Sequence, residues 1–313
     1  TLRRVVKASD RVFQVGNQQR SCQWFREAIA IAQSGLLGDD LTATCYLGAG
    51  PSGGPFKSMP VPEGLDWDRW LGQTPLVPYI RQRCHGTFRW WYEYSGGKLT
   101  DWGAHHIDIA QWAISALDTT PVAIEGTAVH DKRLDCFNTA QTYRGVLTFE
   151  NGNRIIFEDG GKKTNGIMLA GSKEHLFVNR GKLVGNIIDK ITADKKLNAE
   201  IREAAAALYG GEFGRPEVEL TNYGAVARPQ NQSWTRVKQS HMGNFFHCIE
   251  SGKKPISDVV SVGNSTISCH LANIALRLGR SLSWNPASES FAADPAADQM
   301  LARRQRDGYE IAG

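Results

Sequence analysis

The sequence predicts an α+β fold, in which a largely antiparallel sheet is covered by helices on one face. The first observation is a run of β-rich segments joined by short turns, comprising residues 122–129, 139–149, 154–158, 167–170 and 175–178. Parallel strands need crossovers of about a dozen residues or more, so this run indicates antiparallel pairing. The second observation is that segments with helical periodicity lie before and after the run, where they can form a helical layer.

The composition is that of an ordinary globular protein. The chain has 313 residues, of which 41% are hydrophobic and 22% charged, and its formal net charge is +4. This length can bury a sizeable core in one large or two modest domains. No apolar run approaches the roughly 20 residues of a membrane span, and the basic cluster Arg303–Arg306 is typical of a solvated helix face. We therefore expect neither a membrane nor a nucleic acid as a partner.

The six cysteines indicate a reducing compartment. They lie far apart, without Cys-x-x-Cys pairs or zinc-like spacing, which predicts reduced and mostly buried thiols. A cytoplasmic location follows from this. A periplasmic location stays open, because the chain begins at Thr1 in what looks like the middle of a helix and its native amino terminus is not in view.

The first elements are a helix end, a strand and an amphipathic helix. Residues 2–9 have the pattern of a helix end, and residues 12–16 form a short β-rich run that ends at a glycine. Ser21 can cap the apolar helix pattern of residues 24–32, which Gly35 and Gly38 then end. Residues 41–47 alternate and carry β-formers, so they predict a strand that a Gly/Pro-rich loop follows.

An aromatic segment, residues 88–94, comes directly before two glycines. Aromatic rings with an interleaved arginine suit stacking on the apolar faces of sugar rings, and they suit plain core packing equally well. Because the segment runs into Gly96-Gly97, we expect at least one of Arg89, Trp90 and Tyr92 at the wall of a substrate pocket.

The segment from Gly96 to Asp108 is the best candidate for the chemistry. Thr100 is an acceptable N-cap for a helix through Ile114. At about 100° per residue, Asp101, His105 and Asp108 then form one polar stripe on an otherwise apolar helix, and His106 points elsewhere. Buried carboxylates and imidazoles are paired or face a cavity.

A carboxylate beside an imidazole is a general-base arrangement, in which the carboxylate orients the ring and favours its protonated form. The alternative for this stripe is a capping aspartate and a histidine bonded to a neighbouring strand. A metal site from His105, His106 and Asp108 is not expected, because adjacent imidazoles on a helix diverge by about 100°.

The second half of the chain supplies turns and the helical layer. Glu150-Asn151-Gly152-Asn153 is a strong hairpin turn, and residues 171–175 predict another whose glycine has a backbone role. Residues 186–235 contain a helical stretch over 197–208, then a polar connection, and we assign no function to them. Ser240 caps a helix that Gly252 stops, and a long helix follows over 260–278.

The motif Gly-Gly-x-x-x-Asp-x-Gly-x-His-x-x-Asp at residues 96–108 resembles the signature of the glucose–fructose oxidoreductase, inositol dehydrogenase and rhizopine-catabolism (Gfo/Idh/MocA) family. The resemblance implies that Asp101 and His105 are the substrate-facing catalytic pair, with His105 as proton acceptor or donor on the reacting hydroxyl. Asp108 matches a motif position of more structural character and is included among the candidate substrate-binding residues with Arg89, Trp90 and Tyr92. Residues 60–72 and the segment after Gly279 are similar to one bacterial branch of the family.

The same resemblance places two domains in the chain. Residues 1–21 would be the end of a dinucleotide-binding Rossmann domain, and residues 22–313 an α/β substrate-binding and oligomerisation domain. The loop with Gln18 and Arg20 would lie beside the active site as candidate cofactor contacts; an ordinary exposed loop is the alternative. Neither Gly-x-Gly-x-x-Gly between a strand and a helix nor Glu-Lys-Pro occurs in the chain, so the main dinucleotide motif is absent from it.

The resemblance implies an NAD- or NADP-dependent dehydrogenase that acts on a sugar, a polyol or a related carbinol. A second hypothesis keeps the cofactor but uses transient oxidation to eliminate a glycoside. A third is a non-catalytic binding or oligomerisation module. The implied partners are a carbohydrate-like small molecule and further copies of the chain, in a homodimer or homotetramer built on the open sheet face.

Overall fold

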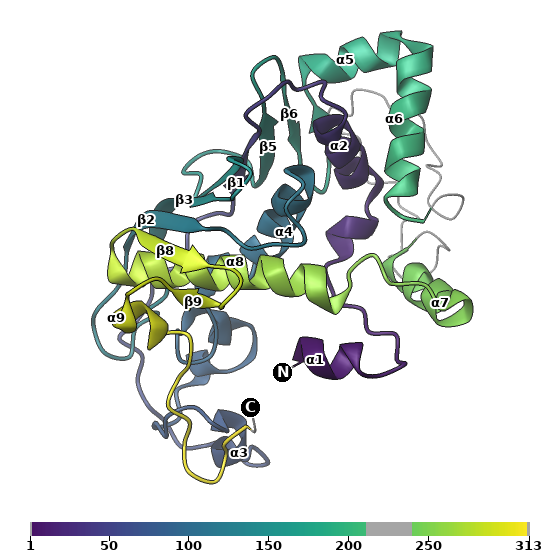
Figure 1. Cartoon of the computed structure of the whole chain (residues 1–313). Coiled ribbons are helices and arrows are strands. Elements are labelled where there is room, and N and C mark those ends of the chain that lie inside the picture. Colours follow the sequence, from purple (N-terminus) through teal and green to yellow (C-terminus); the bar gives the residue numbers. More distant parts are fainter. Residues whose placement is uncertain (1, 211–239, 312–313) are drawn as a thin grey trace.

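The computed structural model of the chain describes residues 2–210 and 240–311 (Figure 1). In this part of the chain, nine strands form one sheet in the order β7-β6-β5-β1-β4-β3-β2-β8-β9. Their bounds are Thr42–Tyr46 for β1, Ala123–Val129 for β2, Thr142–Thr148 for β3, Arg154–Glu158 for β4, Gly166–Ala170 for β5, His175–Val178 for β6, Leu183–Val184 for β7, Leu282–Asn285 for β8 and Ser290–Phe291 for β9. The predicted run of strands is confirmed.

β1 is the exception to the antiparallel pairing. It lies between β4 and β5, antiparallel to β5 but parallel to β4, with Thr42 opposite Arg154 and Ala170. The strand predicted at 41–47 is therefore an interior strand of a sheet whose other strands come much later in the chain. The other pairs in the described sheet are antiparallel, as predicted.

Two turns form where the sequence predicts them. Gly152 adopts φ +84° in the turn between β3 and β4, a conformation that glycine adopts at little cost. Gly171 opens the turn between β5 and β6, and a Cβ atom there would lie 2.3 Å from the carbonyl oxygen of Leu37. The glycine at 171 is therefore required by a close backbone approach.

Helices cover one face of the sheet. The α-helices are α1 Leu2–Lys7, α2 Gln23–Gln33, α3 Trp67–Leu71, α4 Gly103–Ala113, α5 Asn186–Ala193, α6 Lys195–Ala207, α7 His241–Ser251, α8 Val259–Leu278 and α9 Pro295–Asp298, and the 3₁₀ turns are η1 Gln18–Ser21, η2 Arg81–Arg83, η3 His85–Trp90 and η4 Gly97–Leu99. α2, α4 and α8 lie on the same side of the sheet and contact β6, β1 and β2 respectively (Figure 1). Buried and less buried residues alternate along β3 and β4, so the opposite face is open.

Two predicted helix caps are wrong. α2 begins at Gln23 after Cys22, because the Ser21 hydroxyl lies 2.8 Å from Nδ1 of His241 instead of capping the helix. α4 begins at Gly103, because the Thr100 hydroxyl accepts a hydrogen bond from the Gly96 amide at 2.9 Å. Ser240 does cap α7, as predicted, by accepting from the Gly243 amide at 3.0 Å.

The amino-terminal segment forms fewer contacts than the sequence predicts. α1 is present but none of its residues is buried. The strand predicted at 12–16 does not form, because the segment finds a single bridge, between Gln14 and Asp258, and an amide bond from Val15 to Ser257 at 2.9 Å. A strand needs a neighbour along its whole length, and the described chain offers none here.

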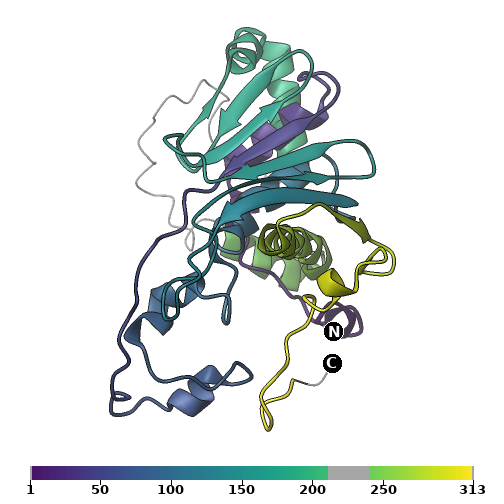
Figure 2. The ribbon, with the colours of Figure 1, turned by 90° about the vertical axis from the view of Figure 1, so that its left-hand side faces the viewer.

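An arm and a tail extend together below the sheet (Figure 2). The arm, residues 55–94, carries α3, η2 and η3, and the tail is residues 299–311. The tail is fastened to the arm by Arg306, which donates to the Gly72 carbonyl at 3.0 Å and is paired with Asp68. The Tyr309 hydroxyl donates to the same carboxylate. The basic cluster at 303–306 thus belongs to an extended tail and not to a helix face, contrary to the prediction.

The remaining predictions concern α6, α8 and the cysteines. α6 confirms the helical stretch predicted at 197–208, and the polar connection predicted after it lies largely in 211–239, outside the described residues. α8 is long and apolar enough to cross a membrane, with a mean hydropathy of 1.2, but most of it is buried against α4 and β2 as a core helix would be. All six cysteines are free and buried, as expected of reduced thiols.

Candidate active site

The two glycines of the motif are required by close packing. A Cβ atom at Gly96 would lie 2.3 Å from Nδ2 of Asn273, and one at Gly97 would lie 2.7 Å from Cβ of Thr139. Gly97 also adopts φ +66°. Contacts this short do not accommodate a side chain, so the turn η4 holds the start of α4 against α8 and against the loop before β3.

Asp101 lies in the turn that precedes α4 and is bound by an arginine. Nη1 of Arg89 donates to both of its carboxylate oxygens, at 2.9 and 3.1 Å. The Arg89 guanidinium lies 4.9 Å from the centre of the Trp90 ring, and the Lys98 ammonium lies 5.3 Å from the same centre. Arg89, Trp90, Lys98 and Asp101 therefore form one cluster, in which the arginine orients the carboxylate and the tryptophan supports both cations.

His105 lies in the first turn of α4 and is partly buried. Its Nδ1 atom is shielded from solvent and has no hydrogen-bond partner. The same does not hold for its Nε2 atom. Burial is the largest influence on its pKa and lowers it; the charge of Arg180 lowers it further, against smaller opposing effects of Asp108 and Asp101. The ring is therefore held neutral near pH 7.

The expected effect of Asp101 on the ring has the right direction but is weak. No hydrogen bond joins the two side chains, because the Asp101 carboxylate is directed to Arg89. The carboxylate of Asp101 raises the pKa of His105 only as the last of four influences. A neutral imidazole has a lone pair, so the site presents His105 as a proton acceptor.

The loop of η1 positions the start of α4. The Asn17 side chain donates to the Ala104 carbonyl at 2.9 Å, and Nε2 of Gln19 donates to the His105 carbonyl at 3.3 Å. Oε1 of Gln19 in turn accepts from Nε of Arg180 at 3.0 Å. The predicted neighbourhood of this loop and the motif helix is thus present, although it is made by Asn17 and Gln19.

His106 points away from His105, as predicted. Its Nε2 lies 2.8 Å from the Asn165 side-chain oxygen and its Nδ1 lies 3.2 Å from Nε2 of Gln19, so the ring is satisfied as a neutral Nε2–H tautomer. Complete burial lowers the pKa of His106 to about 4. Among the described residues, no group of three His, Cys, Asp or Glu side chains is arranged to hold a metal ion.

Asp108 and Arg20 form a buried ion pair with each other, whereas the family resemblance implied contacts with the substrate and the cofactor. The Arg20 guanidinium binds both carboxylate oxygens of Asp108, at 2.8 Å through Nε and 2.5 Å through Nη2. The Ser265 hydroxyl donates to Asp108 at 2.6 Å, and Arg20 also bonds the Ser261 hydroxyl at 2.8 Å. Each residue is only 1% exposed. Neither has surface left for a substrate or a cofactor, and the pair instead joins η1 to α4 and α8.

The other implied contacts lie in three places. Gln18 is half-buried in η1, beside Asn17 and Gln19. Arg89 and Trp90 lie with Asp101 on one side of the aromatic segment. Tyr92 faces the opposite side, where its hydroxyl lies 3.1 Å from Nε2 of His130 and its ring lies 4.7 Å from the Arg277 guanidinium.

The glycine-rich loop after β1 does not form a dinucleotide cradle. A Cβ atom at Gly50 would lie 2.1 Å from the Ala140 carbonyl oxygen, and one at Gly54 would lie 2.7 Å from that of Asp135. These glycines pack against the loop before β3, and the next helix, α3, begins only at Trp67. A pyrophosphate site needs free amides at a helix amino terminus, so this loop does not fit the dinucleotide.

Four residues near the site were missed by sequence reasoning. Lys98, Gln19, Arg180 and Asn165 come from separate segments, and three of them lie outside the motif. Lys98 could have been noticed, because it lies within the motif beside the glycines. The contacts of Gln19, Asn165 and Arg180 are tertiary, and no local pattern marks them.

The comparisons with known proteins agree with this fold. A sequence model described as the oxidoreductase family's C-terminal alpha/beta domain matches residues 48–208, just over half of the chain. No match was found among the curated proteins. Among solved structures, an aldose-aldose oxidoreductase from Caulobacter crescentus complexed with glycerol is 16% identical with a TM-score of 0.55, over 88% of this chain and 65% of that one.

Two further structures are similar to the same degree. An oxidoreductase from Thermotoga maritima is 14% identical with a TM-score of 0.51, over 92% of this chain and 67% of that one. The WlbA dehydrogenase from Bordetella pertussis, in complex with NADH and UDP-GlcNAcA, is 16% identical with a TM-score of 0.51, over 90% of this chain and 68% of that one. The chain thus spans about two thirds of these structures. Together with the family match over residues 48–208, the fold shows that the chain belongs to the Gfo/Idh/MocA oxidoreductase family.

Proposed function

We propose that the protein is an NAD- or NADP-dependent dehydrogenase of a sugar, a polyol or a related carbinol, with His105 as its general base. The observation that carries this proposal is the state of the His105 ring. It is held neutral and lacks a partner on Nδ1, and it lies in the first turn of α4, next to the charged cluster of Asp101 and Arg89. A partly exposed acceptor of this kind is suited to take the proton of a substrate hydroxyl.

In this proposal each residue of the site has a separate role. Nε2 of His105 accepts the hydroxyl proton, because Nδ1 is shielded from solvent. The Asp101 carboxylate, fixed by Arg89, accepts a hydrogen bond from a neighbouring hydroxyl and so orients the substrate. The Trp90 ring offers an apolar face to the C–H side of a sugar. Transfer of a proton to the ring creates a cation, which the charges of Asp101 and Asp108 then stabilise.

The proposal assigns the dinucleotide to other parts of the protein. The glycine-rich loop of this chain does not fit a pyrophosphate, and Arg20 is fully engaged with Asp108. We therefore propose that residues 1–21 border a dinucleotide-binding domain and that residues 22–313 bind substrate. Family membership supports the oxidoreductase class, and it leaves the choice of NAD or NADP to measurement.

The experiment is a turnover assay on the complete protein with a panel of sugars and polyols, followed through the absorbance of reduced nicotinamide. His105→Ala is expected to lower kcat by about 10² to 10⁴-fold, as is usual for loss of an acid–base group. His175→Ala, at an exposed histidine on the first residue of β6, is the matched control and should keep full activity.

Two outcomes would count against the proposal. Turnover of His105→Ala within a factor of about two of wild type would remove His105 from the chemistry. Absence of turnover with both nicotinamide cofactors across the panel would remove the dehydrogenase assignment itself.

A further inference from the structure

A pocket lies between the arm, the tail and the carboxyl end of α8. It has a volume of about 910 Å³ and adjoins a pocket of about 740 Å³, with which it shares five lining residues: Tyr92, Tyr94, Arg277, Met300 and Arg303. We call the two together the arm–tail pocket. Neither Asp101 nor His105 lines it, so the aromatic segment separates it from the candidate active site.

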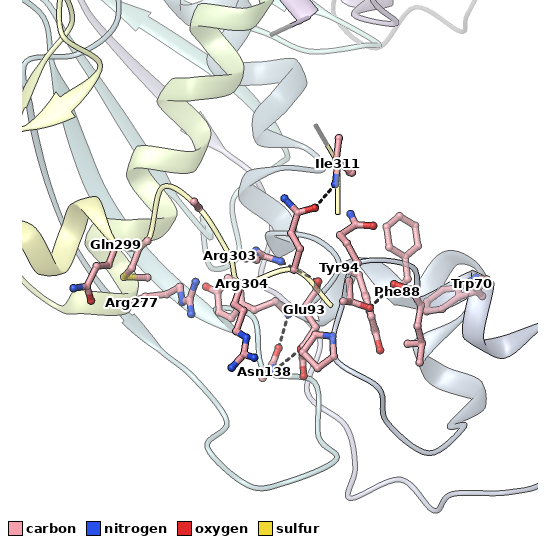
Figure 3. A pocket seen from close by; sticks show the side chains of 18 residues that line it. Trp70, Phe88, Glu93, Tyr94, Asn138, Arg277, Gln299, Arg303, Arg304 and Ile311 are labelled. Atoms are coloured by element: carbon pink, nitrogen blue, oxygen red, sulfur yellow. Dashed lines mark hydrogen bonds between the residues drawn. The ribbon is translucent and has the colours of Figure 1, made fainter. Parts of the chain in front are cut away.

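Three arginines meet at one side of this pocket. Figure 3 shows Arg277 of α8 and Arg303 and Arg304 of the tail grouped together, with the rings of Phe88, Tyr94 and Trp70 toward the other side. In residues 2–210 and 240–311, no carboxylate forms an ion pair with any of the three. Arg303 donates to the backbone carbonyl of Glu93 at 2.9 Å, and Arg277 lies over the Tyr92 ring at 4.7 Å.

The two acidic residues that line the pocket, Glu93 and Glu289, are already bound to other groups. The Glu93 carboxylate accepts from the Asn138 side chain at 3.0 Å and pairs with Arg83 at 3.4 Å. Glu289, on the far wall, is paired with Arg3. Partial removal of water and the like charge of Arg277 both lower the pKa of Arg303, against a weaker effect of Glu93. Arg277 and Arg303 therefore repel each other, and a bound anion would relieve that repulsion.

The outer wall of the pocket is fixed in place. The tail is tied to α3 by Arg306, whose amide donates to the Gln73 carbonyl at 3.1 Å and whose side chain binds Gly72 and Asp68. On the inner wall, the Trp70 ring packs edge to face on Tyr94 at 5.0 Å. A pocket with defined walls on both sides is suited to a ligand of definite shape.

We propose that the arm–tail pocket binds a sugar-sized anion, a ring compound that carries a phosphate or a carboxylate. Guanidinium groups of Arg277, Arg303 and Arg304 hold the anionic group, since their planar donors match both phosphate and carboxylate oxygens. The aromatic side, where Phe88 is 37% exposed, packs on the ring of the ligand. Each of its two parts, of about 910 and 740 Å³, lies within the range of about 300 to 1,000 Å³ that is usual for small-molecule sites.

The test is calorimetric titration of the purified protein with glucose 6-phosphate, glucuronate and neutral glucose. We expect the two anions to bind and glucose to bind at least about tenfold more weakly, because it lacks the charge-assisted bonds. Comparison of the two anions shows whether phosphate or carboxylate is preferred. Absence of binding by both anions at millimolar concentration would overturn the proposal.

Substitutions of the pocket arginines test where the anion binds. The double variant Arg277→Gln with Arg303→Gln should lower the affinity for the anion by at least about tenfold. Arg304→Gln changes an exposed residue and should weaken anion binding less than the double variant does. It keeps the test valid if the double variant misfolds. The matched control is Arg280→Gln, which removes the same charge from the chain just beyond α8, where Arg280 pairs with Asp294 outside the pocket.

The outcome is separable from that of the proposed dehydrogenase. Unchanged affinity in both Arg277→Gln with Arg303→Gln and Arg304→Gln would overturn the inference. Loss of anion binding in Lys98→Gln, with normal binding in the arginine variants, would place the anion beside His105 and would overturn it as well. Neither result depends on turnover, so failure of the dehydrogenase assignment leaves this test intact.

Discussion

His105 is surrounded by charges of both signs, and they make its titration testable. Arg180 lowers the pKa of the ring, and Asp101 raises it. Asp101→Asn should therefore move the pKa of His105 down, and Arg180→Gln should move it up. NMR titration of the ring protons follows both shifts without reliance on activity, and a shift of the same sign in both variants would contradict this electrostatic account.

The same titration predicts the pH dependence of the reaction. A general base must be neutral, so kcat/KM should fall on the acid side below the ordinary histidine pKa of 6.5. Asp101→Asn should carry this acid limb to lower pH and Arg180→Gln should carry it to higher pH. Steady-state profiles of the complete protein measure both.

His106 should make the fold sensitive to acid. Its pKa is about 4 in the folded protein and 6.5 as a free side chain, so the unfolded state binds the proton more readily below pH 6.5. Its contribution to stability is present above that pH and is lost as the pH falls toward 4. Between pH 7 and pH 5 the loss amounts to about 2 kcal/mol.

Urea unfolding of wild type and of His106→Gln at both pH values isolates this effect. The variant keeps polar atoms for Asn165 and Gln19 but cannot titrate. Its free energy of unfolding should change between the two pH values by about 2 kcal/mol less than that of wild type. Equal changes in the two proteins would show that the ring is not held neutral.

At the scale of elements, the Arg20–Asp108 pair should join η1, α4 and α8 energetically. Both side chains are 1% exposed, so Asp108→Asn leaves a buried guanidinium without its counter-ion and should cost about 3 to 5 kcal/mol of unfolding free energy. A double variant, Arg20→Met with Asp108→Asn, should cost less than the sum of the two single changes. Denaturant unfolding measures all three.

The control for this pair is the exposed pair Lys196–Glu200 of α6, in which the two side chains are 88% and 58% exposed. Glu200→Gln should leave the unfolding midpoint unchanged, because solvent screens exposed charges. Additive costs at Arg20 and Asp108 would show that the buried pair does not act as a unit.

The elements themselves could be predicted where their signals are local. Alternating β-formers specified β3 and β4, and Ser240 and Gly252 specified the ends of α7, because each signal lies within a few residues of its effect. The start of α4 could not be predicted from Thr100, whose hydroxyl is taken by the Gly96 amide. The short strands β7 and β9 have two residues each and carry no pattern to detect.

The candidate site could be predicted only in part, for a related reason. The residue types at 101 and 105 mark the motif, but the direction of the Asp101 carboxylate depends on Arg89 twelve residues earlier, and the charge on His105 depends on Arg180. Asp108 has the spacing of a site residue, yet Arg20, 88 residues away in the chain, removes it from solvent. The spacing of residues on a helix predicts the direction in which each side chain points, but it does not predict the partner that the side chain binds.

At the scale of the whole molecule, the open sheet face should join copies of the chain. Register places one row of outward residues across the sheet: Val146, Ile156, Thr44, Met168 and Phe177. A mostly apolar row of this kind is unfavourable in water, so we expect it to be covered in a dimer or tetramer. This expectation was made from the sequence and stays a prediction.

A charge at the centre of the row tests it. Ile156→Glu should shift the protein to monomer in light scattering at micromolar concentration. Ala207→Glu, at an exposed residue of α6 on the helical side, adds the same charge and should leave the assembly unchanged. A wild-type monomer, or an Ile156→Glu protein of unchanged mass, would show that the face is not an interface.

The position of β1 has a consequence for synthesis on the ribosome. β1 is made before its two neighbours in the sheet, β4 and β5, which follow on the order of a hundred residues later. At about 5–20 residues per second, β1 then waits roughly 5 to 20 seconds before either neighbour has been made. A pause or a slow codon run between β1 and β4 lengthens that exposure of an unpaired strand. β1 therefore pairs only once β4 or β5 has left the exit tunnel.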